Sequence, residues 1–351
     1  MGIVMKKIVL AATALAMISG SALAADMPVK AKAPPPPPVV SPWDFAFGSA
    51  LMSDYIFRGV TQSNHKPSVA AYFEPRYNIN DKLQLYVGVS GESISFPNRA
   101  AAEIDIYGGI RPTVGMFAFD FGVWGYLYPG GTCYNAAAVP GSGIPGSDAS
   151  CAVSPFGNSD PVTGALPING NVAKKNASFV EGYGKVNVTL NDNWAVGFNE
   201  YYSPNFLNLG AWGNYASVTA KYTAPSTIFG SSGVGLYVSG EFGRQWLGTS
   251  DSFYGTGLIN PAFAAGIPEP SYNTWNIGIG FTYKVFTLDL RYSDTNLSKG
   301  DCNAFTSDYT AHIASAGSVS AINPLGFQSN WCGATGVAKL SADLTAMTNL
   351  K

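Results

Sequence analysis

The chain of 351 residues has few charged side chains, 12% of the total, many aromatic ones, 13%, and a formal net charge of −2. Average soluble domains contain about 25% charged residues, so the composition, with its 40 glycines, fits the wall of a β-barrel better than a soluble α/β enzyme. The charge balance shows no basic excess and gives no reason to expect nucleic-acid binding.

The first residues have the features of an export signal. Lys6 and Lys7 precede an apolar run at residues 8–18 that is too short to span a bilayer as a helix. Small residues at 22–24 predict cleavage before Ala25, so residues 1–24 are interpreted as a signal peptide. Residues 25–42, with five consecutive prolines, are predicted to form an extended periplasmic tether. Residues 43–351 remain for the folded domain.

From residue 43 onward, apolar and polar residues alternate in segment after segment. The segment 116–128 is the clearest, because Phe117, Phe119 and Phe121 share one parity while Asp120 and Tyr126 share the other. Successive side chains of a strand point to opposite faces, so each segment would have one apolar and one polar face. We predict twelve strands, at residues 43–60, 68–79, 83–96, 101–112, 116–128, 177–190, 194–203, 211–224, 232–247, 271–284, 286–297 and 333–345.

The connections between these strands alternate between short and long. Short turns rich in Asn, Asp and Gly, which tolerate the backbone angles of tight hairpins, are predicted at 80–82, 113–115, 191–193, 225–231 and 284–285. The longest of the other connections are 129–176, 248–270 and 298–332. An exported chain with this asymmetry and an even strand count predicts a closed antiparallel transmembrane β-barrel, with periplasmic turns, extracellular loops and a polar lumen. A soluble sandwich with its apolar face inside is the alternative that alternation alone leaves open.

Aromatic residues gather near the predicted strand ends, as in the interfacial girdles of membrane barrels. The alternative is the general enrichment of aromatic residues in strands. We expect the girdle to contain Trp43, Tyr55, Phe57, Tyr77, Tyr126, Tyr128, Trp194, Tyr201, Tyr202, Tyr222, Trp275, Tyr283 and Tyr292.

Four cysteines are present, and none of them forms a C-x-x-C pair that would suggest a zinc site or thioredoxin-like chemistry. Export to an oxidising compartment favours disulfides. Four cysteines allow three pairings. We prefer Cys133–Cys151 and Cys302–Cys332, because each pair lies within one long loop.

Charged residues on the polar parity are the candidate pore-lining groups. They are expected to form ion-paired ladders across neighbouring strands or to be solvated by a water-filled lumen. Twelve strands predict a narrow pore, and the acidic excess predicts a mild cation preference, although an ion-paired plug that does not conduct is the alternative. The predicted acids are Asp44, Asp54, Glu74, Glu92, Glu103, Asp105, Asp120, Glu181, Glu241, Asp289 and Asp343, and the bases are Arg58, Arg76, Arg111, Lys185, Lys221, Arg291 and Lys339.

Residues 52–63 read M-S-D-Y-I-F-R-G-V-T-Q-S, and residues 103–109 read E-I-D-I-Y-G-G. Both motifs resemble those of the TorF family of proposed porins, and the resemblance covers most of the chain from residue 43. It implies an outer-membrane β-barrel in a Gram-negative bacterium. The chain departs from many barrels in that its last strand is followed by a tail at 345–351 instead of closing on Phe. The matching motif residues are Asp54, Tyr55, Phe57, Arg58, Gly59 and Gln62.

We expect Asp54 and Arg58 to lie in the first strand and to form a structural clamp at the extracellular rim, with partners such as Glu74 or Arg76. The loop 129–176 is a candidate for an inward-folded constriction, with a surface loop as the alternative.

An enzyme and a surface scaffold are the other function classes. Membrane hydrolases need an activated nucleophile, but no G-x-S-x-G motif is present, and the chain has only two histidines, His65 and His312, both in predicted loops. We expect His65 to be a solvated loop residue, and we predict no catalytic site, no metal site and no cofactor. The expected partners are outer-membrane lipid, small hydrophilic solutes or ions, and the barrel-insertion machinery. The pattern does not indicate an oligomeric state.

Overall fold

The computed structural model describes residues 41–131, 134–135, 172–256, 260–313 and 318–350. The predicted signal peptide, residues 25–40 of the predicted tether and the predicted Cys133–Cys151 pair lie outside the described residues. Among the described residues, no helix combines the length and apolar character needed to cross a membrane.

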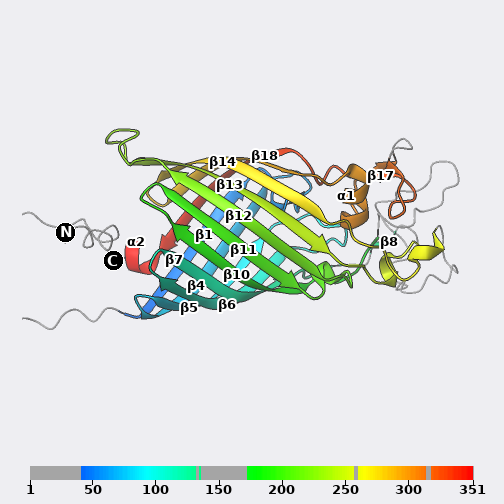
Figure 1. Ribbon diagram of the computed structural model, residues 1–351, viewed down its shortest axis with the longest axis horizontal. Coiled ribbons are helices and arrows are strands. Elements are labelled where there is room, and N and C mark those ends of the chain that lie inside the picture. The colour runs from blue at the N-terminus through cyan, green and yellow to red at the C-terminus, as the bar shows by residue number, and fades with distance from the viewer. Residues whose placement is uncertain (1–40, 132–133, 136–171, 257–259, 314–317, 351) are drawn as a thin grey trace, which may run out of the picture. The chain divides into compact units, whose positions relative to one another are not determined.

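Twelve strands form one closed antiparallel barrel in the ring order β1-β18-β15-β14-β13-β12-β11-β10-β7-β6-β5-β4, which confirms the predicted fold class (Figure 1). Each strand pairs with its neighbours along the chain, and β1 pairs with β18 to close the ring. The strands are β1 (Trp43–Met52), β4 (Ser68–Asn80), β5 (Leu83–Glu92), β6 (Glu103–Val114), β7 (Phe117–Leu127), β10 (Phe179–Thr189), β11 (Trp194–Ser203), β12 (Gly213–Thr223), β13 (Val234–Leu247), β14 (Tyr272–Tyr283), β15 (Phe286–Thr295) and β18 (Thr335–Thr345).

Alternation along each strand sets the two faces of the wall, as β7 illustrates. The Phe121 and Val123 side chains are exposed on the outer face, at 46% and 55% of their surface, whereas Tyr126 is only 6% exposed. On the next strand, Lys185 lies opposite Asp120 in the register, so the charged parity continues from β7 to β10. A broad apolar outer face in water would be costly, and in lipid it is the expected surface of a closed barrel.

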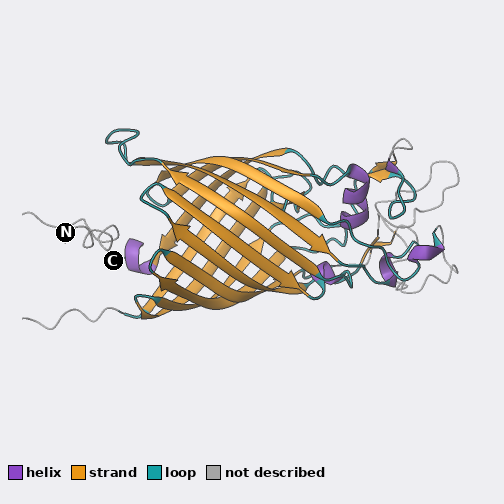
Figure 2. Cartoon of the chain, viewed as in Figure 1, coloured by secondary structure: helices purple, strands orange, loops and turns teal. Residues whose placement is uncertain are grey.

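The two ends of the barrel differ in their connections (Figure 2). Tight turns at 81–82, 115–116, 190–193 and 284–285 and a ten-residue connection at 224–233 join strands at one end, near the predicted positions. Longer loops at the other end carry short elements. These elements are β2 (Ile56–Phe57), β3 (Val60–Thr61), β8 (Tyr134–Asn135), β9 (Val172–Ala173), η2 (Phe206–Asn208), η3 (Ser252–Tyr254), η4 (Pro261–Phe263), α1 (Lys299–Thr306), β16 (His312–Ile313) and β17 (Phe327–Gln328), while α2 (Ala346–Asn349) follows β18.

The first strand is shorter than the predicted 43–60. It ends at Met52, which pairs directly with Ser68 of β4, so the wall closes while residues 53–67 leave it. Within these residues β2 and β3 form a small hairpin. The hairpin turns at Arg58 and Gly59, whose φ angles of 47° and 77° match the positive φ that a two-residue type I′ turn needs. A strand cannot continue through such a turn.

The described apolar core lies at the loop end of the molecule. Phe206, Tyr254, Tyr272, Phe305 and Trp331, from three different loops or their borders, pack in one buried cluster. The predicted Cys302–Cys332 disulfide is present, and Cys302 belongs to this cluster. The bond links α1 to the end of the loop between β15 and β18.

The predicted aromatic girdle is only partly correct. Trp43 packs edge-to-face against Tyr77, and Trp194 packs against Tyr222. Both pairs lie at strand ends near the turns, where the two tryptophans are exposed. In contrast, Tyr126 and Tyr128 are buried inside. Tyr55, Phe57 and Tyr201 also line an internal cavity. Strand-end position alone did not separate the two groups, because parity and the inward turn of residues 53–67 decide which face an aromatic ring occupies.

Candidate functional site: the barrel lumen and its inward segment

Residues 53–67, here called the inward segment, cross the lumen from β1 to the far wall. In the ring of twelve strands, β11 lies six places from β1. The Arg58 guanidinium contacts β10 and β13 through hydrogen bonds, and the rings of Tyr201 on β11 and Tyr215 on β12 at 4.9 and 4.5 Å. Contacts with four consecutive strands opposite its origin place the tip of the segment across the barrel mouth.

An ion pair anchors this tip. Arg58 Nη1 donates to Glu181 Oε1 at 2.9 Å and Nη2 donates to Oε2 at 2.7 Å, while Gln245 Oε1 accepts a third bond at 3.0 Å. The side chains are 5% and 0% exposed. A bidentate pair of this kind is strong and directional, and aromatic rings around the cation replace water with π faces. Asp54 and Arg58 were expected to pair with charges on neighbouring strands, such as Glu74 or Arg76. Instead, Arg58 pairs with Glu181 across the lumen, and Asp54 accepts from Thr61 and Ser63 of its own segment.

Gly59 allows the close approach at the tip. A Cβ atom at this position would lie 2.2 Å from Thr295 Cγ2 and 2.7 Å from Thr274 Oγ1. The Arg-Gly turn therefore serves two purposes, since it reverses the chain and lets the backbone reach β14 and β15.

The outer side of the segment docks on the loop 296–334. Thr61 N donates to Trp331 O at 2.9 Å, and Trp331 Nε1 donates to Asn64 Oδ1 at 2.9 Å. Val60 also forms an antiparallel β-bridge with Cys332, and the disulfide links Cys332 to Cys302 in α1. The segment is thus held on both sides, by the far wall of the barrel and by a loop that contains a disulfide.

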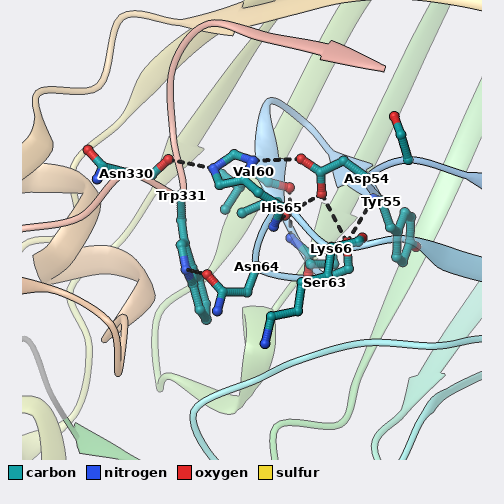
Figure 3. Close-up of polar contacts among 12 residues, drawn as sticks. Asp54, Tyr55, Val60, Ser63, Asn64, His65, Lys66, Asn330 and Trp331 are labelled. Carbon is teal, nitrogen blue, oxygen red and sulfur yellow. Dashed lines mark hydrogen bonds and ion pairs between the residues drawn. The ribbon is translucent and has the colours of Figure 1, made fainter. Parts of the chain in front are cut away.

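His65 joins the two loops, and Figure 3 shows its ring between Asp54 and the Asn330 carbonyl. Nδ1 lies 2.7 Å from Asp54 Oδ2 and Nε2 lies 2.7 Å from Asn330 O. Both partners are acceptors, so only the doubly protonated ring satisfies both contacts. The hydrogen bond that His65 donates to Asp54 raises the pKa of His65 above its usual value, against the opposing effect of partial burial. His65 was expected to be a solvated loop residue; its side chain is 38% exposed, but both of its ring nitrogens are hydrogen-bonded.

Two cavities lie inside the barrel beneath the segment. One of about 570 Å³ has four acidic and three basic side chains in its lining, and one of about 540 Å³ has the same balance. Phe57 and Tyr55 of the inward segment, with Tyr126 and Tyr201 of the wall, border both. The charges of the first cavity are Glu74, Glu92, Asp105, Asp343, Arg76, Lys185 and Lys339, and those of the second are Asp54, Glu92, Glu241, Asp289, Arg58, Arg291 and Lys339.

Ion pairs brace the wall near the turn end, as the predicted ladders required. Glu74 accepts from Arg76 at 2.6 Å and from Arg111 at 2.7 Å. Arg111 also lies 3.3 Å from Asp120, whose other oxygen accepts from Tyr86. One network therefore joins β4, β5, β6 and β7.

A second network braces the other side of the barrel. Asp289 and Arg291 pair at 3.0 Å on β15, and Tyr237 of β13 donates to Asp289 at 2.7 Å. Glu241 accepts from Tyr215 at 3.0 Å. The predicted pore bases Lys185 and Lys221 lie over tyrosine rings, at 4.5 Å from Tyr183 and 4.3 Å from Tyr237. Thus the predicted pore-lining charges on the strands lie on the inner parity.

The acids Glu92, Glu103 and Asp105 lie together at the loop end of β5 and β6. Tyr55 of the inward segment and Tyr128 donate to Glu103 at 2.6 and 2.8 Å. The motif residue Tyr55 therefore belongs to the lumen wall contacts. The Gln62 side chain donates to the Val60 carbonyl at 3.0 Å, and the Gln62 carbonyl accepts from Ser95 N at 2.8 Å.

Sequence reasoning found these residues but missed the inward segment, and it named the loop 129–176 as the candidate constriction instead. Residues 136–171 of that loop lie outside the described residues. The missed signal was the Arg58–Gly59 pair in the middle of a predicted strand, because glycine after a polar residue is a turn signal.

The family described as "Bacterial protein of unknown function (Gcw_chp)" matches residues 38–140. No curated protein matches the sequence.

Several solved structures resemble the chain at low identity. An outer membrane channel from Pseudomonas putida F1 is 10% identical, with 92% of this chain and 100% of that chain covered and a TM-score of 0.42. LpxR from Salmonella typhimurium is 9% identical over 85% of this chain and 99% of that chain, with a TM-score of 0.37. OmpT, an outer membrane protein of Vibrio cholerae, is 10% identical over 86% and 96%, with a TM-score of 0.32.

Proposed function

We propose that the protein is a narrow outer-membrane channel for small hydrophilic solutes or ions, with its extracellular mouth constricted by the inward segment. The observation that carries the proposal is the pair of charged cavities inside a closed barrel, both bordered by Phe57 of the inward segment. The motif resemblance to the TorF porins supports the same function. The apolar outer face supports location in a membrane.

A mild cation preference is part of the proposal. Each cavity has one more acidic than basic side chain in its lining, and a narrow low-dielectric passage amplifies the effect of a small charge excess on ions. Because the acidic excess is a single side chain in each cavity, we expect the preference to be weak.

The test is electrical measurement on the purified, refolded protein in planar bilayers, with boiled protein as the control. We expect a small conductance. In a tenfold KCl gradient, we expect a reversal potential of the sign that indicates a preference for K⁺ over Cl⁻. A reversal potential on the anion side would contradict the selectivity, and silent membranes containing correctly inserted barrels would contradict the open channel.

A non-conducting structural barrel is the second candidate. The fully buried Arg58–Glu181 pair and the docking on a disulfide-linked loop favour a permanently closed mouth. Vesicle swelling assays distinguish the two, because a permanently closed barrel would leave vesicles impermeable to sugars and salts alike. Heat-modifiable gel mobility of the outer-membrane fraction tests the location that both candidates share.

A further inference from the structure

We propose that Glu92, Glu103 and Asp105 form a binding site for a hard divalent cation, with Ca²⁺ as the best fit. The site lies on the inner wall, at the end of β5 and the start of β6. It depends on the barrel fold but not on conduction, so it stands or falls separately from the channel.

The register brings the three carboxylates together. Glu92 of β5 lies directly opposite Glu103 of β6, and Asp105 follows two residues later on the same face. Like charges directly opposite on a sheet destabilise it. One carboxylate oxygen from each residue lies within 4.8 Å of the other two. Oxygens bound to one Ca²⁺ at 2.3–2.6 Å can be separated by up to about 5 Å, so one ion can reach all three.

Two of the carboxylates retain free, buried oxygens. Asp105 is 3% exposed, and its Oδ2 accepts from Ser90 at 2.9 Å. Its Oδ1 and the Oε2 of Glu92 are buried and have no hydrogen-bond partner in the described part of the chain, and the nearby Trp124 indole N–H, which is the donor that approaches Asp105, is itself without an acceptor at hydrogen-bond geometry. Buried polar atoms are nearly always partnered, so two such acceptors beside each other indicate a missing ligand.

The charge balance points the same way. None of the three acids forms an ion pair with any described basic side chain. Lys339 of β18 borders the same cavity as Glu92 and Asp105 and is the basic group that partly offsets them. Buried charges are normally paired or bound to metal. A divalent cation would supply the missing positive charge.

The donor set and its surroundings select the kind of ion. The ligands are carboxylates only, which suit Ca²⁺ or Mg²⁺ and not the softer metals. Tyr55 and Tyr128 hold the Glu103 carboxylate in place, as outer-shell partners do for metal ligands. Glu92 and Asp105 line the cavity of about 570 Å³, which leaves room for the water ligands that complete a Ca²⁺ shell.

The experiment is titration of the folded barrel in detergent, freed of metal with a chelator. Calorimetry with Ca²⁺ should show one saturable site per chain. Tb³⁺, a luminescent substitute for Ca²⁺, should bind with tryptophan-sensitised emission that Ca²⁺ displaces, because Trp124 borders the same cavity. We expect Glu92→Gln and Asp105→Asn each to weaken binding by at least about tenfold, since affinity follows the charge of the ligand set.

Glu269→Gln is the matched control, because Glu269 is also buried, with an unpartnered Oε2, but lies outside the cluster. It should leave binding unchanged. If the cluster variants fail to fold, Trp124→Phe keeps all three carboxylates, and it should lower the Tb³⁺ emission that is excited through tryptophan. The absence of saturable Ca²⁺ binding to the wild-type barrel would overturn the proposal. Equal binding by folded Asp105→Asn, or undiminished emission from Trp124→Phe, would also overturn it.

Discussion

The Arg58 guanidinium and the Glu181 carboxylate form a two-bond ion pair in the interior of the barrel, at 2.9 and 2.7 Å. One partner comes from the loop after β1, and the other is at the loop end of β10. The pair therefore ties a segment that starts on one side of the ring to the opposite wall. A constricted mouth follows from this one connection, and it makes the inward segment the part of the molecule to test first.

Removing Arg58 should destabilise the barrel strongly. Arg58→Ala leaves the Glu181 carboxylate buried without its counter-charge, which costs about 3–5 kcal/mol in comparable pairs. Urea unfolding in phospholipid vesicles measures the change. The double variant with Glu181→Gln should cost less than the sum of the two single variants, because the partners are coupled.

Arg244→Ala is the matched control for this comparison. Arg244 precedes Gln245 on β13 but points to the other face of the strand, where it bonds Asn273 at 2.9 Å. We expect a change within about 0.5 kcal/mol. An Arg58→Ala variant that is as stable as Arg244→Ala would show that the lumenal pair does not hold the segment.

Gly59 should tolerate no side chain, in contrast to a glycine at the other end of the barrel. Gly115 has a φ of +60° and open space around it, whereas Gly59 has a φ of +77° and Thr295 in the way. Alanine in a left-handed conformation costs about 1–2 kcal/mol. Gly115→Ala should show only this loss in the same unfolding assay, and Gly59→Ala a clearly larger one. Equal losses would contradict the close packing of the tip.

His65 should titrate above its usual pKa. Because the pKa of the folded state is raised, the contact with Asp54 and Asn330 contributes fully to stability below about pH 6.5 and is lost as the pH rises through the folded-state pKa. The chain has two histidines, so NMR of histidine-labelled protein gives two titration curves, and His65→Asn assigns them. Amide exchange in residues 53–67 should quicken over the same pH range. A His65 pKa at or below 6.5 would contradict the acceptor–acceptor arrangement.

Glu269, in the loop between β13 and β14, should make the protein less stable at alkaline pH. Burial raises its pKa to about 8, so the folded state keeps the proton while the unfolded chain releases it above pH 4.5. Stability from this group therefore falls as the pH rises from about 4.5 to 8. Glu269→Gln should match the wild type at pH 4 and be more stable at pH 9 in thermal unfolding scans. A difference that is constant across this range would contradict the assignment.

The strand pattern could be predicted because lipid-facing residues such as Phe121 and lumenal ones such as Asp120 alternate with a period of two, and all twelve strands were found. The Cys302–Cys332 bond followed from loop proximity. The partner of Arg58 could not be predicted, because Glu181 is distant in sequence and no local pattern encodes a contact across a lumen. The Glu92–Glu103–Asp105 cluster depends on strand register, which a one-residue shift would destroy.

The central claim is that residues 53–67 constrict a lumen that would otherwise conduct more freely. Met52 and Ser68 are direct partners on β1 and β4, so an Asn-Gly hairpin turn can replace the whole segment while β1 and β4 keep their pairing. Glu181→Gln in the same variant removes the charge that the loss of Arg58 would leave unpaired. The deciding measurement is single-channel conductance of this variant beside the wild type, after gel mobility has shown that both are folded. We predict that the variant conducts several times more than the wild type. Equal or lower conductance of the folded variant would contradict the account.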